Sequence, residues 1–169
     1  TSTLGDGKTL PLMDRDNPAL REIHPQSNQG VCADAIASME GISREATEAL
    51  AVESQRRAAR AISEGRFSKS LVTVYNEDGS VALDHEEFPR PQTTPESLAA
   101  LKPSFAMLAD LPINEDGITY RSLVNKVYPD VKIEHIHHAG NSSGVVDGSA
   151  AILLASPEYA KKQGWKPRA

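Results

Sequence analysis

The chain is organised around residues 138–156, which read HAGNSSGVVDGSAAILLAS. The three glycines of this run lack a Cβ, and the small polar residues between them let another molecule approach the backbone closely. The pattern predicts an extended segment that enters a short helix and then an apolar strand over 150–155. Glycine and serine at the start of a helix are also typical of simple capping, so this run alone leaves binding and packing both open.

Composition excludes several classes of protein. A length of 169 residues suits one domain, or one domain and a piece. The formal charge of −5 gives no electrostatic basis for binding nucleic acid. The single cysteine, Cys32, excludes an internal disulfide and fits a reducing compartment, so we expect a cytoplasmic protein. No apolar run approaches the ~20 residues of a membrane helix, so no membrane partner is expected.

The first third of the sequence predicts an arm and two helices. Residues 1–28 are broken by glycine and proline and predict a loop, in which Asp14 and Asp16 form a turn rather than a metal site. Apolar spacing predicts a short helix over 31–39 and, after the N-cap Ser43, a long helix over 44–64. The long helix carries a basic triplet that indicates a solvated face rather than a phosphate site: Arg56, Arg57 and Arg60.

The remaining residues predict short elements. Strands over 71–75 and 80–83 form a hairpin, and Thr94 caps a helix that has Pro95 at its first position. One short helix is expected within 106–129 and a strand over 131–137. A final helix, over 157–163, follows the apolar strand at 150–155. This mixture of helices and a few strands makes the predicted fold class α+β.

Two groups of side chains raise the question of a metal or a nucleophile. His135, His137 and His138 form a histidine cluster, and the first two would share one face of their predicted strand, where both could ligate zinc. No cysteine or carboxylate stands beside them at ligand spacing, so we expect a hydrogen-bonded strand edge and no metal. Cys32 falls on the apolar face of the helix over 31–39, where a cysteine behaves as a small hydrophobe and lacks an activating neighbour.

Six motifs together resemble the thiolases, the acyl-CoA acyltransferases of the acetyl-CoA acetyltransferase family. They are Gly41-Ile42-Ser43-Arg44-Glu45, Ser54-Gln55-Arg56, Gly65-Arg66-Phe67, Thr93-Thr94, Leu101-Lys102-Pro103 and the run from Asn141 to Gly148. The resemblance implies that residues 1–143 form the coenzyme A-binding loop domain, built from helices and a small mixed sheet. It implies that residues 144–169 supply the last helix-strand-helix elements of the amino-terminal core half.

The resemblance also implies where acyl-CoA is bound. Arg90 stands where the family has its coenzyme A-contacting arginine, Ser97 and Ser143 match serines near the pantetheine arm, and Ala139 lies beside that tunnel. Coenzyme A is then part of a substrate, and no tightly bound cofactor is expected. No catalytic residue is assigned, because the nucleophilic cysteine motif of the family lies upstream of this span. Its Asn-Glu-Ala-Phe, Gly-His-Pro and second cysteine motifs lie downstream.

The sequence departs from the short-chain thiolases at two places. Asn28-Gln29 stands where most of them have a His-Met pair, and the segment 107–135 is longer. The longer segment and its histidine-rich end are similar to bacterial thiolases that act on bulky acyl chains. The chain also does not begin with methionine, and we expect it to be trimmed or excised from a longer protein.

These features predict the acyl-CoA-binding segment of a thiolase of lipid and fatty acid metabolism, which catalyses thiolysis or Claisen condensation of acyl-CoA thioesters. We expect the segment to be inactive alone, and its partners to be acyl-CoA, the rest of the thiolase chain and further copies in a homo-oligomer. Two alternatives stay open at this point. One is a stand-alone, non-catalytic module that binds acyl-CoA or lipid, and the other is an unrelated metal-dependent hydrolase that uses the histidine cluster.

Overall fold

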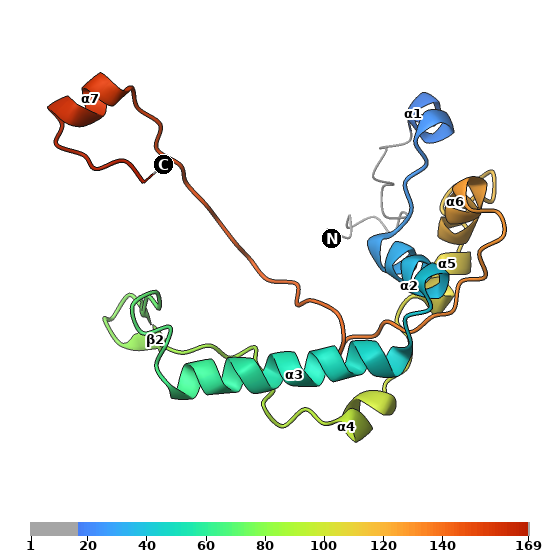
Figure 1. Ribbon diagram of the computed structural model, residues 1–169, viewed down its shortest axis with the longest axis horizontal. Helices are drawn as coiled ribbons and strands as arrows, with labels where there is room; N and C mark the ends of the chain where they lie inside the picture. Colours follow the sequence, from blue (N-terminus) through green and yellow to red (C-terminus); the bar gives the residue numbers. More distant parts are fainter. Residues whose placement is uncertain (1–16, 169) are drawn as a thin grey trace.

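The computed structural model, which describes residues 17–168, is arranged along one long helix, α3 (Arg44–Ser63) (Figure 1). The Ser43 hydroxyl oxygen accepts a hydrogen bond from the Ala46 amide at 3.2 Å, and Glu45 adds a negative charge in the first turn. Both features stabilise the start of a helix. Beyond the last turn Gly65 adopts a positive φ of 65°, which glycine permits. The predicted long helix is therefore confirmed.

The hydrophobic core lies at one end of α3, among three shorter helices. These are α2 (Gln29–Glu40), α5 (Ala106–Asp110) and α6 (Tyr120–Val127). Asn28 caps α2 through a 2.9 Å bond from the Gly30 amide, and Gly41 ends it with a φ of 65°. The core cluster consists of seven buried residues from these helices and the turn between them: Val31, Ala35, Ala109, Ile113, Tyr120, Leu123 and Val124.

The middle of the chain returns along α3 as a hairpin and one short helix. Strands β1 (Val74–Tyr75) and β2 (Val81–Leu83) pair antiparallel, as predicted, and both are exposed. Helix α4 (Pro95–Ala99) packs against α3 and begins with a capping box between Thr94 and Ser97. The described residues therefore form a helix-rich α+β arrangement, in which the small sheet is antiparallel rather than mixed.

The helices differ from the prediction in the first and the third quarter of the chain. Residues 17–28 contain a helix, α1 (Pro18–Ile23), which begins because the Asn17 side chain accepts a 3.0 Å bond from the Leu20 amide. The predicted turn at Asp14 and Asp16 lies outside the described residues. The segment 106–129 holds two helices instead of one, since a second capping box, between Thr119 and Ser122, starts α6.

Two predicted strands are also absent from residues 17–168. Residues 131–137 form no ladder; the Glu134 amide donates to Ser38 Oγ at 2.9 Å and the His137 carbonyl accepts from Ser104 N at 2.9 Å. Residues 150–155 are extended and solvent-exposed, with Leu154 86% exposed, and the short helix expected before them does not form. A strand needs a neighbour for its backbone groups, and the described part of the chain offers none there.

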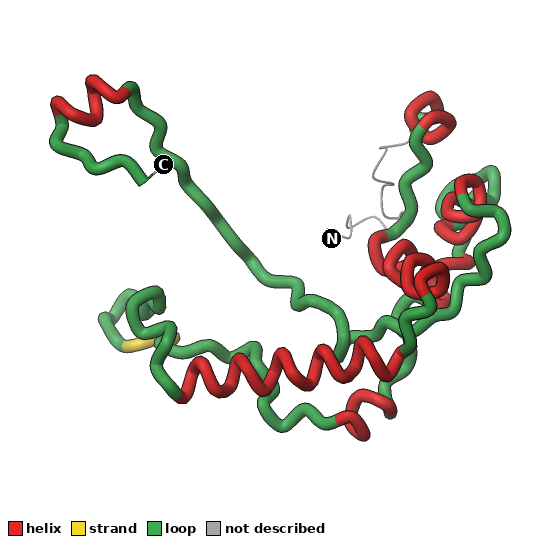
Figure 2. Tube along the Cα trace, in the orientation of Figure 1, coloured by secondary structure: helices red, strands yellow, loops and turns green. Residues whose placement is uncertain are grey.

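The carboxyl-terminal segment leaves the body near the start of α3 and runs as an extended chain to α7 (Pro157–Lys162) (Figures 1 and 2). Helix α7 is capped by Ser156, whose hydroxyl accepts a 3.2 Å bond from the Tyr159 amide. Its Tyr159 ring packs edge-on against Trp165, with ring centroids 5.7 Å apart. None of the helices described in residues 17–168 has the length and apolar character required to cross a membrane.

Candidate functional site

Arg90 lies in an exposed loop beside α3 and keeps part of its guanidinium available. Its backbone amide donates a 2.7 Å hydrogen bond to Gln55 Oε1 on α3, which fixes the loop to the helix. Its Nη1 donates to the carbonyls of Glu87 and Phe88 at 2.6 and 2.8 Å. Within the described residues, Nε and Nη2 of Arg90 donate no hydrogen bond. These two groups are free to bind an anion, and the loop below them is already ordered.

Ser97 stabilises the start of α4, in addition to its predicted position near the pantetheine arm. Its hydroxyl accepts from the Thr94 amide at 3.0 Å and donates to the Thr94 carbonyl at 2.8 Å, which closes the capping box of α4. The side chain is exposed, so a ligand can reach it from the solvent side. A substitution of Ser97 would therefore disturb the start of α4 as well as any contact with a ligand.

Ala139 and Ser143 flank a tight turn that is held against α3 by Asn141. The Asn141 side chain accepts from the His138 amide at 2.7 Å and donates to Thr47 Oγ1 on α3 at 2.9 Å. Ala139 and Ser143 are both exposed. The turn is thus fixed by polar contacts that the sequence pattern did not predict, because Thr47 and Asn141 lie 94 residues apart.

The segments that carry the four predicted residues lie next to one another. A Cβ added to Gly140 would collide with Leu98 of α4, and one added to Gly144 would collide with the ring of Phe88, two residues before Arg90. Glycine, which has no Cβ, lets these side chains pack directly on the backbone of the turn. The turn at 138–144 is therefore packed between the Arg90 loop and α4. Sequence reasoning named residues on three segments, and the structure brings these segments together.

A narrow groove runs between α3 and the turn. Its volume is about 200 Å³, and it is lined on one side by α3 and on the other by the turn. The lining residues are Thr47, Leu50, Ala51, Ser54, Gln55, Gly140, Asn141 and Ser142. Gln55, which holds the Arg90 loop, and Ser142, which neighbours Ser143, place this groove beside the predicted site. Most of these lining side chains are small or polar.

Two buried ionisable residues, Glu48 and His138, connect the turn to α3. Glu48 is 6% exposed, and its Oε1 accepts from Arg44 Nε at 2.6 Å and from His138 Nε2 at 3.0 Å. The hydrogen bond from Arg44 lowers the pKa of Glu48, and the bond from His138 adds to it, against the opposing effect of burial. The spacing of four residues between Arg44 and Glu48 was the signal in the sequence for this ion pair.

Asp34 explains two of the three clustered histidines. It is fully buried and accepts hydrogen bonds from Nδ1 of His135 and of His137, each at 2.7 Å, and from the amides of Ile136 and His137 at 3.1 and 3.0 Å. Burial raises the pKa of Asp34, but these four hydrogen bonds outweigh it and lower the pKa below its usual value. In residues 17–168 no group of three or more His, Cys, Asp or Glu side chains could hold a metal ion.

The outer nitrogen of His135 is occupied too. Arg121 Nη2 lies 3.0 Å from His135 Nε2 and, as an arginine, must be the donor. Nε2 of His135 is therefore the acceptor in this contact, and Nδ1 faces Asp34. This network fastens residues 135–137 to α2, and Cys32, on the same helix, is half-buried against the hydrophobic core.

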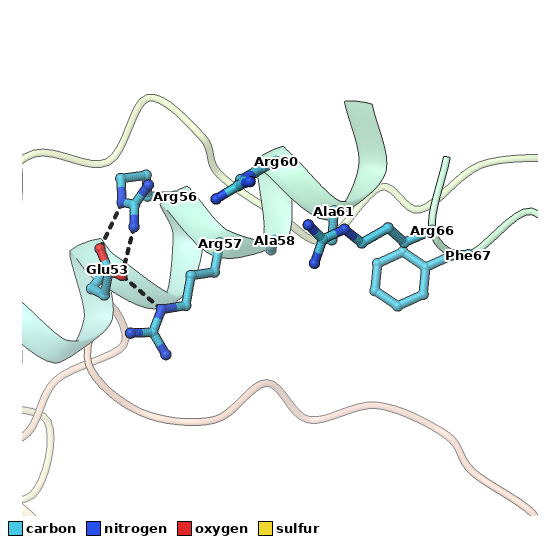
Figure 3. A pocket seen from close by; sticks show the side chains of 8 residues that line it. All are labelled: Glu53, Arg56, Arg57, Ala58, Arg60, Ala61, Arg66 and Phe67. Carbon is cyan, nitrogen blue, oxygen red and sulfur yellow. Dashed lines mark hydrogen bonds and ion pairs between the residues drawn. The ribbon is translucent and has the colours of Figure 1, made fainter. Parts of the chain in front are cut away.

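The basic face of α3 forms a second, larger hollow of about 590 Å³, shown in Figure 3. Its four arginines are already paired: Glu53 binds Arg56 and Arg57, and Glu64 binds Arg60 and Arg66. The hydrogen bonds from Arg56 and Arg57 lower the pKa of Glu53 to about 2. All four guanidiniums are exposed, which agrees with the predicted solvated face, and exposed pairs of this kind contribute little to stability.

Comparison with known proteins points to one family. A model of the thiolase amino-terminal domain matches residues 2–108, more than half of the chain. The chain is 36% identical over 155 residues to the beta-ketoadipyl-CoA thiolase of Pseudomonas aeruginosa, covering 90% of the chain and 32% of that protein. It is 35% identical to the peroxisomal 3-ketoacyl-CoA thiolase of Homo sapiens, covering 93% and 35%. It is 32% identical to the acetyl-CoA acetyltransferase of Thiocystis violacea, covering 85% and 31%. The chain spans about a third of the length of these curated relatives.

Proposed function

Because the chain belongs to the thiolase family, we propose that it is the acyl-CoA-binding segment of a thiolase, an acyltransferase that cleaves or forms carbon–carbon bonds between acyl-CoA thioesters. One observation carries the proposal. The turn at 138–144 packs against both the Arg90 loop and α4, so the segments that carry the residues matched to the family's coenzyme A contacts lie next to one another beside α3. The names of the relatives, which all specify CoA thioesters, support the same substrate class.

Each residue of this surface has a distinct part in binding. The free Nε and Nη2 groups of Arg90 would bind phosphate at the nucleotide end of coenzyme A. Ser97, Ala139 and Ser143 would line the path of the pantetheine arm with small side chains and backbone. Binding energy from this remote handle positions the reacting thioester without changing its chemistry. The acyl-CoA is a substrate, and no tightly bound cofactor is needed for this step.

The chemical step requires groups outside this segment. Thiolysis or Claisen condensation needs a thiolate nucleophile, an acid/base partner and an oxyanion hole. In this proposal the catalytic cysteine and histidine motifs lie in the other two-thirds of a complete thiolase. Cys32 is not the nucleophile, because it packs against the hydrophobic core and makes no hydrogen bond to a base within the described residues.

We also propose the domain division that the family resemblance implies. Residues 1–143 form the loop domain that covers the active site, and 144–169 belong to the amino-terminal core half. The exposure of the apolar run supports this division, since Ile152, Leu153 and Leu154 are 85%, 77% and 86% exposed. Surface of this kind requires a cover, which the remainder of the core would supply in a cytoplasmic homo-oligomer.

The proposal is tested by titrating the chain with acetyl-CoA in a calorimeter. We expect saturable binding that Arg90→Ala weakens about tenfold, as loss of one charged phosphate contact implies. The effect should shrink at high salt because the site is exposed. In a complete thiolase containing this segment, the same substitution should raise KM with kcat nearly unchanged, since the contact serves the ground and transition states alike.

Arg57→Ala is the matched control. Arg57 is an exposed arginine of α3 that pairs with Glu53 on the basic face, and its removal should leave acetyl-CoA binding unchanged. Absence of binding by the wild-type chain would reject the proposed function. Equal losses for Arg90→Ala and Arg57→Ala would show that binding reflects only general attraction to basic residues.

A further inference from the structure

The buried pair of Glu48 and His138 lies between two elements of the proposed acyl-CoA site, the end of α4 and the turn at 138–144. On one side, Arg44 bonds Glu48 and also donates from Nη2 to the carbonyls of Leu98 and Leu101, at 3.0 and 2.7 Å, at the end of α4. On the other side, Glu48 Oε1 lies 3.0 Å from His138 Nε2, at the start of the turn. One carboxylate therefore connects the helix that carries Ser97 with the turn that carries Ala139.

The hydrogen bonds of His138 fix its protonation state. The Gly140 amide donates to His138 Nδ1 at 3.1 Å, so Nδ1 is an acceptor and the ring proton lies on Nε2. His138 Nε2 then donates to Glu48. The ring is completely buried, and both of its nitrogens are used. An imidazole held in this way orients the backbone around it rather than reacting.

His138 restricts the position of the turn. The two hydrogen bonds of the ring reach opposite sides of it, one to α3 and one to the amide of Gly140 within the turn. Gly140 sits directly on Leu98 of α4 and on Leu101 just after it, with the Leu101 Cδ1 atom 2.9 Å from the position that a Cβ would take there. A small rotation of the turn would separate these surfaces and shift Ala139 and Ser143. The placement of these two residues thus depends on a ring that a bound ligand would not touch.

We infer that His138 is a positioning residue that, through Glu48, fixes the wall of the site that receives the pantetheine arm of acyl-CoA. This inference rests on the proposed function. It assigns His138 no contact with the substrate and no role in the chemical step. It distinguishes two parts of the site: the Arg90 loop, whose backbone Gln55 binds, and the turn, which Glu48 and His138 hold together with Asn141.

The separation gives a test with two probes. Coenzyme A would contact both parts, whereas adenosine 3′,5′-bisphosphate would contact only the Arg90 part. We expect His138→Leu to raise the Kd of coenzyme A about tenfold, toward that of the bisphosphate, and to leave the Kd of the bisphosphate unchanged. His138→Gln, which keeps a donor toward Glu48, should recover most of the affinity for coenzyme A. A general loss of structure would weaken both probes together.

His135→Leu is the matched control, because His135 is a neighbouring half-buried histidine that bonds Asp34 and not the turn. It should leave the ratio of the two Kd values at its wild-type level. A second readout is independent of any ligand: amide hydrogen exchange at Gly140 and Asn141 should accelerate in His138→Leu and not in His135→Leu.

The outcomes separate the two proposals. Unchanged coenzyme A affinity in His138→Leu, or an equal loss for both probes, would overturn the positioning role while Arg90→Ala still supports the binding site. Failure of the wild-type chain to bind either probe would reject the proposed function. If neither probe binds, unaltered amide hydrogen exchange at Gly140 in His138→Leu would also reject the positioning of the turn by His138.

Discussion

Replacement of Asp34 by asparagine should destabilise the fold by about 3 kcal/mol, because the amide cannot satisfy the network around it. Asp34 accepts four hydrogen bonds, two from imidazoles and two from backbone amides. An asparagine that keeps its oxygen toward Ile136 and His137 presents its NH₂ group to the Nδ1 proton of His135. A hydrogen bond to a charged group contributes about 1.5–3 kcal/mol, and an unsatisfied buried donor costs about 1–3 kcal/mol more.

His135 has no easy way to adapt to the asparagine. Moving its proton to Nε2 would satisfy the new amide but would turn an N–H toward the Arg121 guanidinium, which is itself a donor 3.0 Å away. Two donors then face each other at Nε2 of the ring instead of at Nδ1. Removing Arg121 should relieve it, so Asp34→Asn should cost about 1–2 kcal/mol less in an Arg121→Leu background than in the wild type.

Urea unfolding followed by circular dichroism measures both effects at neutral pH. Asp130→Asn is the control, since Asp130 is exposed and makes no hydrogen bond among the described residues; its effect should stay within about 0.5 kcal/mol. The reasoning fails if Asp34→Asn falls within that range as well. It also fails if Asp34→Asn lowers the unfolding free energy equally in the wild type and in the Arg121→Leu background, because His135 would then not be locked by Arg121.

The same network predicts how stability depends on pH. The pKa of Asp34 is lowered in the folded state, so its contribution is fully present above the unfolded pKa of about 3.9 and is lost as the pH falls through the folded pKa. The difference in unfolding free energy between the wild type and Asp34→Asn should be constant near neutrality and should shrink only below about pH 4. A difference that shrinks between neutrality and pH 5 would contradict the assignment to Asp34.

Three further predictions follow from packing. Gly140→Ala should destabilise the chain by about 1–3 kcal/mol, because its Cβ meets Leu98 and Leu101, whereas Gly148→Ala, with open space around it, should be nearly neutral in the same urea experiment. Cys32→Ser should change stability by less than about 1.5 kcal/mol. Intact-mass measurement after incubation with acetyl-CoA should find no acetyl group on the wild-type cysteine. Stoichiometric acetylation with release of coenzyme A would restore Cys32 as a candidate nucleophile. The chain alone should self-associate through its exposed apolar run, and sedimentation should show a smaller species for Leu153→Glu; equal sizes would place the contact elsewhere.

Local signals in the sequence predicted the helices well and the strands poorly. Ser43, Thr94 and Ser156 each cap the helix that was expected after them, because a cap acts within three residues. The run at 150–155 has the composition of a buried strand, yet it forms none in the described chain. A strand is completed by a neighbour, and composition reports only that the run can be buried, not what covers it.

The candidate site shows the same division between local and distant information. The resemblance to thiolases predicted Arg90, Ser97, Ala139 and Ser143 from motifs, and it implied that they share a site without saying what holds them there. Glu48 and His138 are 90 residues apart, and neither has a motif of its own. A single histidine next to an alanine and a glycine carries no signal for a buried carboxylate on a distant helix.

Successive histidines determine the register of the segment that leads into the site. His135 and His137 bond Asp34 on α2, and the next residue, His138, bonds Glu48 on α3. Of the apolar residues in 131–137 only Ile136 is fully buried, so hydrophobic packing alone would hold this segment weakly. A shift that put each residue in the place of the one before it would bring Ile136 to Asp34 in place of His135 and Ala139 to Glu48 in place of His138. Each buried carboxylate would then lose a histidine partner, which is costly. The two carboxylates therefore favour one alignment, and that alignment positions the turn at 138–144, part of which lines the groove.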